Sequence, residues 1–344
     1  MAGHRKVRPG FILPSAAFTV SRKQVRFFES LETEPQVGDL VYGSVAYLGQ
    51  HSQLENQQGR IHVIGAGSNS VFVFGNRYAP DYYEGVVPGS FRRDVDLLAR
   101  SGIVGEVRCR NAKVKDPTRV RLKGYVCDRN GEVLNTRKYP RVIPSRTSKT
   151  ARRARMVLVV GTSMNSGKSM SAAACCWALA AMGHNVRGSK VTGTASLKDI
   201  LLMEDSGARP VNDFTYLGYP STYLLEEAEL LHVFNTLDLK YANNPRNFWV
   251  VEIADGLLQR ETAMLLRSDV VRSRIHKLIF AAGDAFGALG GLKVLRDDFD
   301  LVPDAISGVC SGSPLGIREL AAFTDIPVFD NMQRDLKQLA AILI

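Results

Sequence analysis

Apolar and polar residues follow two different patterns along the chain, and the change falls near residue 140. Between residues 37 and 140, short runs alternate apolar with small or polar residues, as in 38–49 and 60–74, and turn-forming residues separate them. Alternation with a period of two is typical of strands that are buried on one face. We therefore predict a mainly-β domain over 1–140, a small barrel or sandwich, with one short helix near 91–101.

The segment 141–155 is basic, contains Pro and Ser, and lacks apolar periodicity, so it is predicted to be a linker. After it, apolar runs alternate with stretches of helical period over 156–344. Strands are expected at 156–160, 185–191, 247–253, 276–282 and 304–310, and helices are expected to begin near residues 168, 197, 222, 258, 285, 314 and 332. Strands that alternate with helices in this way form a parallel sheet covered on both faces. The predicted fold class of this second domain is α/β.

The first apolar run of the second domain leads into the loop 161–169, Gly-Thr-Ser-Met-Asn-Ser-Gly-Lys-Ser, which opens an Ala-rich helix. Backbone N–H groups of such a loop converge on an anion, and the helix dipole reinforces their effect. We expect Gly167 to permit close backbone approach, Lys168 to neutralise the β- and γ-phosphates, and Ser169 to ligate Mg²⁺. The predicted nucleotide contacts are Gly161, Thr162, Ser163, Asn165, Ser166, Gly167, Lys168, Ser169 and Met170.

Five residues separate the two glycines of this loop, one more than in the standard phosphate loop. With that spacing, 161–169 resembles the loop of the dethiobiotin synthetase group of P-loop proteins, in which a Gly-Thr pair starts the loop. Two further segments fit the likeness in order and distance, Gly-Ser-Lys-Val-Thr-Gly-Thr at 188–194 and Trp-Val-Val-Glu-Ile-Ala-Asp-Gly-Leu-Leu at 249–258. The resemblance covers 156–330 and extends, through Val-Asn-Asp-Phe at 211–214, to an uncharacterised family that shares this core.

The resemblance implies roles for four residues. Lys168 would bind phosphates, Ser169 the metal, Glu252 would be a second metal-shell carboxylate, and Lys190 would contact the transferred phosphate or the substrate. The residues themselves agree for Glu252, which ends an apolar strand at the sheet edge where open α/β folds bind ligands. A carboxylate there needs either Mg²⁺ or a basic neighbour. Lys190 is alternatively a surface lysine at a strand end. The predicted catalytic residues are therefore Lys168, Lys190 and Glu252.

Two aspartates are weaker candidates for the same site. Asp213 completes the predicted metal set with Ser169 and Glu252, although capping of a helix would explain it equally well. Asp255 precedes a glycine, so it either joins the site or shapes an Asp-Gly turn.

The chain departs from the synthetase pattern at three places. Met164 stands where a hydroxyl is expected near the γ-phosphate, and Ile253-Ala254-Asp255-Gly256 replaces a turn of smaller residues. Ser163 occupies the position of the additional loop lysine of partitioning and anion-pump ATPases. The sequence also lacks the Asn-Lys-x-Asp motif that selects guanine, which favours ATP.

Charge is distributed unevenly between the two domains. Residues 1–155 contain 27 Lys and Arg against 13 Asp and Glu, whereas the remaining residues contain 17 against 21. A basic domain of this kind either faces an anionic partner such as nucleic acid or presents a solvated surface. The segment 74–85 adds Arg77, Tyr78 and Tyr82, which suit stacking on single-stranded nucleic acid but would equally suit a turn packed on the barrel.

Composition limits the setting in which the protein works. The five cysteines are an odd number without CxxC spacing, so they are predicted to be reduced thiols in a cytoplasmic protein. No apolar run approaches the eighteen or so residues of a membrane span, and the basic N-terminus does not fit a secretory signal. The Gly-rich segment 285–298 is a candidate subunit contact, as a homodimer would use, although helix packing alone would explain it.

Two functional hypotheses follow. The first is an enzyme that depends on ATP and Mg²⁺ and transfers the γ-phosphoryl group to a carboxylate-like small molecule, with catalysis by positioning and charge neutralisation. The alternative is a nucleotide-regulated ATPase switch whose basic N-terminal domain binds nucleic acid or a partner protein.

Overall fold

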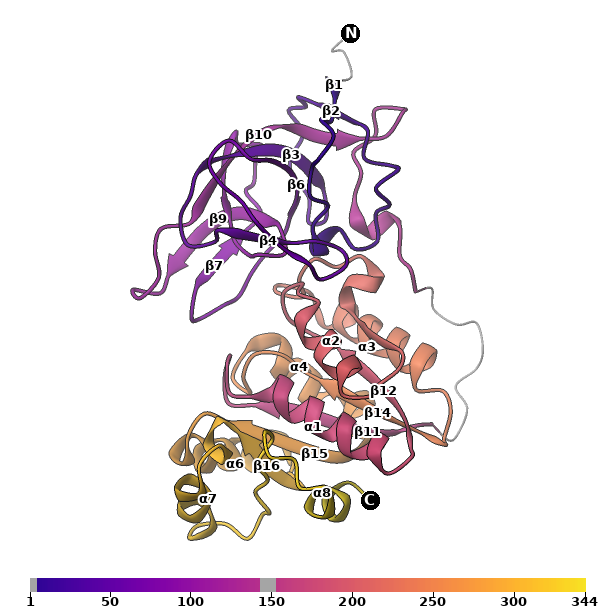
Figure 1. Cartoon of the computed structure of the whole chain (residues 1–344), viewed down its shortest axis with the longest axis vertical. Coiled ribbons are helices and arrows are strands. Elements are labelled where there is room, and N and C mark those ends of the chain that lie inside the picture. The colour runs from indigo at the N-terminus through magenta and orange to yellow at the C-terminus, as the bar shows by residue number, and fades with distance from the viewer. Residues whose placement is uncertain (1–4, 143–152) are drawn as a thin grey trace. The chain divides into compact units, whose positions relative to one another are not determined.

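The computed structural model describes residues 5–142 and 153–344, whose course is drawn in Figure 1. The chain forms two compact units. The first comprises Met1–Ile143 together with the segments Thr194–Leu197 and Phe214–Leu224, and the second comprises the rest. The boundaries predicted from the sequence do not anticipate these two segments. Most of the predicted linker, 143–152, lies outside the described residues.

The first unit consists mainly of strands. They are β1 (Arg5–Lys6), β2 (Phe27–Glu29), β3 (Leu40–Tyr47), β4 (Gln53–Glu55), β5 (Ile61–Val63), β6 (Asn69–Phe74), β7 (Tyr83–Val86), β8 (Asp94–Leu97), β9 (Ile103–Arg110) and β10 (Thr118–Cys127). Five of them pair in a closed circuit, β3-β6-β9-β8-β10 and back to β3, in which only the β6–β9 pair is parallel. Closure of the circuit makes this unit a barrel, one of the two predicted alternatives.

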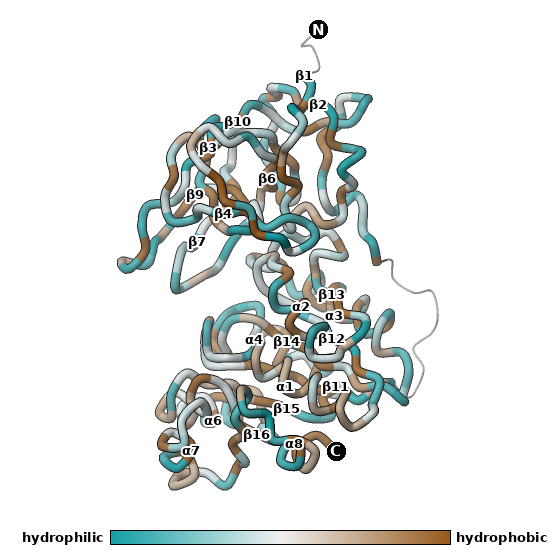
Figure 2. The backbone as a smooth tube through the Cα atoms, in the orientation of Figure 1, coloured by the Kyte–Doolittle hydropathy of each residue, from teal (hydrophilic) through white to brown (hydrophobic). Residues whose placement is uncertain are grey.

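Period-two patterning builds two cores on opposite faces of these strands. Val41 and Phe72 belong to one buried cluster, whereas their chain neighbours Tyr42 and Val73 belong to the other. The strand β6, which is hydrophobic (brown) along much of its length in Figure 2, is buried from Ser70 onward. Because successive side chains point to opposite faces, one such strand supplies both clusters.

The helix predicted near 91–101 is wrong. Residues Asp94–Leu97 form β8, which pairs with both β9 and β10. Its two aspartates alternate with Val95 and Leu97, which are buried, and this period-two pattern outweighs the local helix signal.

The second unit is a six-stranded sheet covered by helices. Its strands are β11 (Arg155–Gly161), β12 (Asn185–Lys190), β13 (Val211–Asp213), β14 (Asn247–Glu252), β15 (Ile275–Ala282) and β16 (Ala305–Gly308). All neighbours are parallel, in the order β13-β12-β14-β11-β15-β16. The parallel α/β fold and its five predicted strands are confirmed. The three-residue strand β13 is additional.

The helices of this unit begin close to where the sequence places them. They are α1 (Lys168–Ala181), α2 (Lys198–Asp205), α3 (Glu227–Tyr241), α4 (Arg260–Arg267), α5 (Asp269–Arg272), α6 (Ala285–Phe299), α7 (Pro314–Ala321) and α8 (Leu336–Leu343), and the 3-10 turns of the two units are η1 (Ser15–Ala17), η2 (Thr136–Lys138), η3 (Phe214–Leu217) and η4 (Val309–Ser311). The adjacent Cys175 and Cys176 are fully buried in α1, as packing residues would be. Burial raises the pKa of the Cys175 thiol to about 12.

Register brings three polar side chains to one sheet edge. Lys190, the last residue of β12, lies beside Asp213 of β13 on one side and beside Glu252 of β14 on the other. Glu252 in turn pairs with Val159 of β11. Because all these strands are parallel, their carboxyl ends share this edge, where open α/β sheets bind ligands.

No helix in the described ranges has the length and apolar character that crossing a membrane requires.

Candidate functional site

The loop that joins β11 to α1 owes its tight course to glycines. Gly167 has a φ of +98° and caps α1, and a Cβ atom at this position would lie 2.7 Å from the Cα atom of Gly308. A Cβ atom at Gly161 would lie 2.4 Å from the Ser166 hydroxyl oxygen. A side chain at either position would therefore displace the loop.

Two other segments hold the loop from outside. After β14, the Leu257 N–H donates to the Gly161 carbonyl at 3.0 Å, and a Cβ atom at Gly256 would lie 2.2 Å from the Thr162 carbonyl oxygen. After β16, the Val309 N–H donates to the Ser166 carbonyl at 3.1 Å. The loop is therefore fixed at both ends by backbone contacts.

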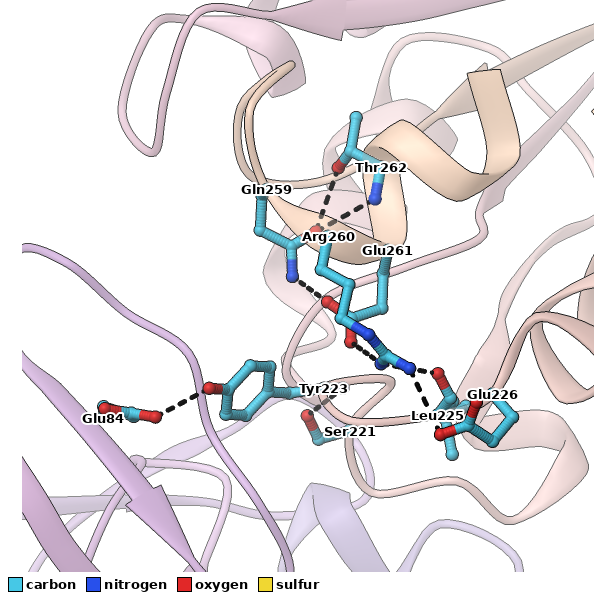
Figure 3. Close-up of polar contacts among 9 residues, drawn as sticks. All are labelled: Glu84, Ser221, Tyr223, Leu225, Glu226, Gln259, Arg260, Glu261 and Thr262. Carbon is cyan, nitrogen blue, oxygen red and sulfur yellow. Dashed lines mark hydrogen bonds and ion pairs between the residues drawn. The ribbon is translucent and has the colours of Figure 1, made fainter. Parts of the chain in front are cut away.

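The segment after β14 is itself fixed by the start of α4. The Gln259 side chain accepts from the Thr262 N–H at 3.0 Å, and the Thr262 hydroxyl donates to the Ala254 carbonyl at 2.8 Å. Arg260 donates to the Leu225 carbonyl at 2.9 Å, as Figure 3 shows. Contacts with the start of α4 thus hold the turn that follows Glu252 in place.

Lys168 lies across the loop with its ammonium group buried. Its Nζ donates to the Ser163 carbonyl at 2.7 Å, and the residue is 6% exposed. Burial lowers the pKa of Lys168, against the attraction of Glu252 and Asp255. A buried cation beside converging N–H groups is what binding of a phosphate requires.

Three oxygen-bearing side chains converge beside this lysine. The Ser169 hydroxyl oxygen lies 3.0 Å from Asp199 Oδ1 and 3.2 Å from Glu252 Oε1. One hydroxyl donates only one hydrogen, so it satisfies one carboxylate at a time. Glu252 is 2% exposed, and its Oε2 has no hydrogen-bond partner among residues 5–142 and 153–344. A buried carboxylate oxygen left in this way is costly without a cation.

Lys190, which is buried, and Asp199, which is partly buried, form an ion pair beside these oxygens. Burial opposes charge on both, but their mutual attraction outweighs it, so the pKa of Lys190 is raised and that of Asp199 is lowered. Burial and the nearby charge of Asp199 raise the pKa of Glu252. The ionised form of Glu252 is therefore less stable here than in water, even with two lysines nearby.

The arrangement fits a magnesium ion. Within the part of the chain that the structure describes, no group of three or more His, Cys, Asp or Glu is placed to hold a metal alone. Mg²⁺, however, is usually held by one or two carboxylates with water and substrate phosphates. The Ser169 hydroxyl, Asp199 and the unpartnered Glu252 oxygen form such a partial set.

Most of the predicted site residues come together, with one unforeseen member. Lys168, Ser169, Lys190 and Glu252 meet at the sheet edge. Asp213 is fully buried beside Lys190, and metal ligation by it stays a prediction. The remaining predicted contacts (Gly161, Thr162, Ser163, Asn165, Ser166, Gly167 and Met170) lie in the loop and the first turn of α1, and their binding of nucleotide stays a prediction.

Sequence reasoning missed Asp199 and the segment that begins at Gly308. Asp199 occupies the first turn of α2, where an acidic residue also serves the helix dipole. The one sequence signal that could have indicated Asp199 is its distance of nine residues from Lys190, the residue with which it pairs. Gly308 gave no signal in the sequence, because its contact with the loop depends on the neighbouring strand β15.

The tyrosine-rich segment of the first unit packs against the barrel, as one of the two predicted alternatives has it. Arg77 is buried and donates to the Leu98 carbonyl, and binding of nucleic acid by this unit stays a prediction. Its guanidinium lies 5.1 Å from the centre of the Tyr82 ring, which stacks with His51 at 5.7 Å. Burial and the charge of Arg77 lower the pKa of His51 to about 4. These rings pack within the unit.

Comparison with known proteins gives no family for the chain. No protein-family model matches it, and no curated protein matches it significantly. Similar solved structures include the signal recognition particle receptor FtsY of Elizabethkingia anophelis with GDP, at 13% identity and a TM-score of 0.39 over 59% of this chain and 67% of that one. A ParA family ATPase of Chlorobium tepidum is similar at 12% identity and a TM-score of 0.35, over 55% of this chain and 90% of that one. FtsY of Mycoplasma mycoides is similar at 14% identity and a TM-score of 0.33, over 60% of this chain and 73% of that one.

With TM-scores below 0.5, these likenesses carry no conclusion about activity. The class rests on the coordinates: a parallel sheet, a glycine-bounded loop between β11 and α1, and a lysine and serine that open the helix. The second unit therefore has the fold and loop arrangement of a P-loop unit, and nucleotide binding by it stays a prediction.

Proposed function

We propose that the protein binds ATP with Mg²⁺ in the loop 161–169 and acts on the γ-phosphoryl group. The observation that supports this most directly is the buried Glu252 oxygen, unpartnered among the described residues, next to the Ser169 hydroxyl and two lysines. Loop N–H groups and Lys168 would hold the phosphates. Ser169, Asp199 and Glu252 would hold Mg²⁺, which would supply positive charge that neutralises the phosphates.

For the reaction, we propose phosphoryl transfer to a carboxylate-like small molecule. An oxygen of the acceptor would form a bond to the γ-phosphorus while the bond to the β,γ-bridging oxygen breaks, giving an acyl phosphate and ADP. Lys190 is buried, and its ion pair with Asp199 holds its ammonium group at the sheet edge. A fixed positive charge there would stabilise the charge that develops on the transferred group. The resemblance to dethiobiotin synthetases supports the class of acceptor.

A second candidate is a nucleotide-regulated ATPase switch. It is favoured by the course of the chain, because the segments that follow β12 and β13 belong to the first unit. A switch needs an element whose arrangement the nucleotide biases. In this hypothesis water is the acceptor, and the basic first unit would bind nucleic acid or a partner protein.

Thermal unfolding with ATP, with GTP and with or without Mg²⁺ tests nucleotide binding. At about 100 times its dissociation constant, a ligand stabilises the folded state by about 2.7 kcal/mol, and Lys168→Ala should abolish this shift. Equal shifts in wild type and variant would place the nucleotide elsewhere. Chromatographic measurement of ADP, with and without candidate carboxylates, then separates transfer from hydrolysis, since hydrolysis needs no acceptor.

A further inference from the structure

The chain leaves the second unit twice, each time just after a residue of the site. Four residues after Lys190 it enters the segment Thr194–Leu197, and directly after Asp213 it enters Phe214–Leu224, both of which belong to the first unit. It returns at Lys198, one residue before Asp199. Asp199 therefore lies only two residues beyond a segment that belongs to the first unit.

Backbone pairing and burial hold this segment inside the first unit. Thr194 forms an antiparallel bridge with Ser221, and the Ala195 N–H donates to the Pro220 carbonyl at 2.9 Å. Ala195 is 2% exposed and belongs to the same hydrophobic cluster as Leu40 of β3. The segment is thus part of the barrel's core packing.

The partner segment is anchored in turn by side chains of the first unit. The Thr136 hydroxyl donates to the Gly218 carbonyl at 2.6 Å. The Tyr223 hydroxyl donates to Glu84 Oε1 at 2.7 Å, a contact drawn in Figure 3. A Cβ atom at Gly218 would lie 2.4 Å from the Thr136 carbonyl oxygen. The two paired segments, Thr194–Leu197 and Phe214–Leu224, are therefore anchored in the first unit.

One carboxylate grips the end of the segment that leads to Asp199. Glu55, the last residue of β4, is 2% exposed. Its Oε1 accepts from the Leu197 N–H at 2.8 Å, and its Oε2 accepts from the Ser196 hydroxyl at 3.4 Å and lies 3.8 Å from Arg100. A hydrogen bond from a backbone N–H to an ionised acceptor is stronger than one between neutral groups.

The partners of Glu55 differ from those of a carboxylate that serves only the barrel. Asp96 of β8 is also buried, and it accepts from the Val107 N–H at 3.0 Å and pairs with Arg119 at 3.1 Å, both on neighbouring strands. Glu55 has the same kind of partners, a backbone N–H and an arginine, but its N–H partner is the residue two before Asp199.

We propose that Glu55 is a positioning residue for the metal side of the nucleotide site. By holding the Leu197 N–H, it fixes the start of α2 and keeps Asp199 within reach of Ser169. This inference rests on the proposed binding of ATP with Mg²⁺. Site geometry must be held within about 0.5 Å by supporting residues, and loss of such support typically lowers metal affinity by about 10–100-fold.

The test measures Mg²⁺ dependence in the full chain with a non-hydrolysable ATP analogue. In Glu55→Ala, the Mg²⁺ concentration for half-maximal tight binding should rise by about 10-fold, while analogue binding in EDTA should stay unchanged because the loop is intact. Glu55→Gln keeps a carbonyl oxygen for the Leu197 N–H and should restore part of the loss. Glu55→Leu keeps the buried volume but has no hydrogen-bond acceptor. If Glu55→Ala does not fold, the same rise in the Mg²⁺ concentration is expected in Glu55→Leu.

Hydrogen exchange gives a readout that needs no ligand. Amides 196–200 should exchange faster in Glu55→Ala than in wild type. Asp96→Ala is the matched control: it should lower the melting temperature but leave both the Mg²⁺ dependence and the exchange of 196–200 unchanged. A change in Asp96→Ala equal to that in Glu55→Ala would overturn the proposal, because barrel stability alone would then explain it.

The remaining outcomes separate this inference from the proposed function. If wild type does not bind the analogue, the proposed function fails, and the positioning role fails with it. If wild type binds and Asp199→Asn loses the Mg²⁺ dependence while Glu55→Ala and Glu55→Leu retain it, the site stands and the role of Glu55 is overturned.

Discussion

Two buried clusters of the second unit combine carboxylates with two cations, and they differ in how completely the charges are paired. Asp238, in α3, is 1% exposed and pairs with both Arg153 and Arg274. Arg274 reaches it from two nitrogens, with Nε 3.2 Å from Oδ2 and Nη2 3.1 Å from Oδ1. Both oxygens of this carboxylate therefore have partners.

Glu252 is as deeply buried as Asp238, but its cations are engaged elsewhere. Lys168 donates to the Ser163 carbonyl and Lys190 pairs with Asp199, while Glu252 Oε2 has no hydrogen-bond partner in the described ranges. A fully paired carboxylate is what a structural ion pair needs, whereas an incompletely paired one is stable only if something binds there. The comparison supports a structural role for Asp238 and agrees with our proposal that Glu252 binds a ligand.

The largest expected effect is on the structural cluster. Asp238→Asn leaves two arginines without a buried counter-charge, so the free energy of unfolding should fall by about 3–5 kcal/mol. Denaturant titration measures this. Asp297→Asn, which breaks exposed pairs with Lys293 and Arg296, is the control and should leave the free energy of unfolding nearly unchanged. A small loss in Asp238→Asn would remove the contrast between the two clusters.

Glu252→Gln should behave in the opposite way. The amide keeps the shape but removes a buried charge that the fold does not compensate, so the protein without ligands should be at least as stable as wild type. Turnover of ATP should fall by about 100-fold, equivalent to about 2.7 kcal/mol of activation free energy. Near-normal turnover with lowered stability would make Glu252 a structural residue like Asp238.

The raised pKa of Glu252 predicts that the free energies of Mg²⁺ binding and of unfolding both depend on pH, by about 1.4 kcal/mol per pH unit where Glu252 titrates. Mg²⁺ needs the ionised carboxylate, so Mg²⁺ affinity should fall about tenfold for each pH unit below this pKa. Without metal, the raised pKa means that the folded state binds the proton more tightly, so stability should decrease as pH rises from the unfolded pKa through the folded one. Titration of Mg²⁺ at several pH values measures the first effect, and Glu252→Gln should lack both.

The P-loop region was accessible from sequence because its signals are local. The strand 155–161, the loop and the helix are adjacent in the chain, so apolar pattern and residue type suffice to place Lys168 and Ser169. Glu252 was placed through the strand that it ends, at the sheet edge where open α/β folds bind ligands, whereas Lys190 was placed through the resemblance.

The parts that sequence reasoning missed depend on pairing between distant segments. Asp199 joins the site because Thr194–Leu197 is held by residues more than 100 positions earlier, such as Glu55. The strand β8 was taken for a helix because its pairing with β9 and β10 is invisible to a local pattern. The sequence left two roles open for Arg77, and its burial against the Leu98 carbonyl depends on a contact 21 residues away along the chain.

The smallest expected effects concern the basic first unit, for which a nucleic-acid partner remains our proposal. If its exposed cations bind single-stranded nucleic acid, Lys113→Ala in the full chain should weaken binding uniformly across sequences and reduce the salt slope by about 1. Arg77→Ala should instead lower stability, because Arg77 is buried and hydrogen-bonded, and should leave the slope unchanged. Fluorescence anisotropy at several salt concentrations distinguishes the two variants. Absence of retained oligonucleotide at low salt would leave the excess charge as a solvated surface, since a basic unit attracts phosphates only weakly without built contacts.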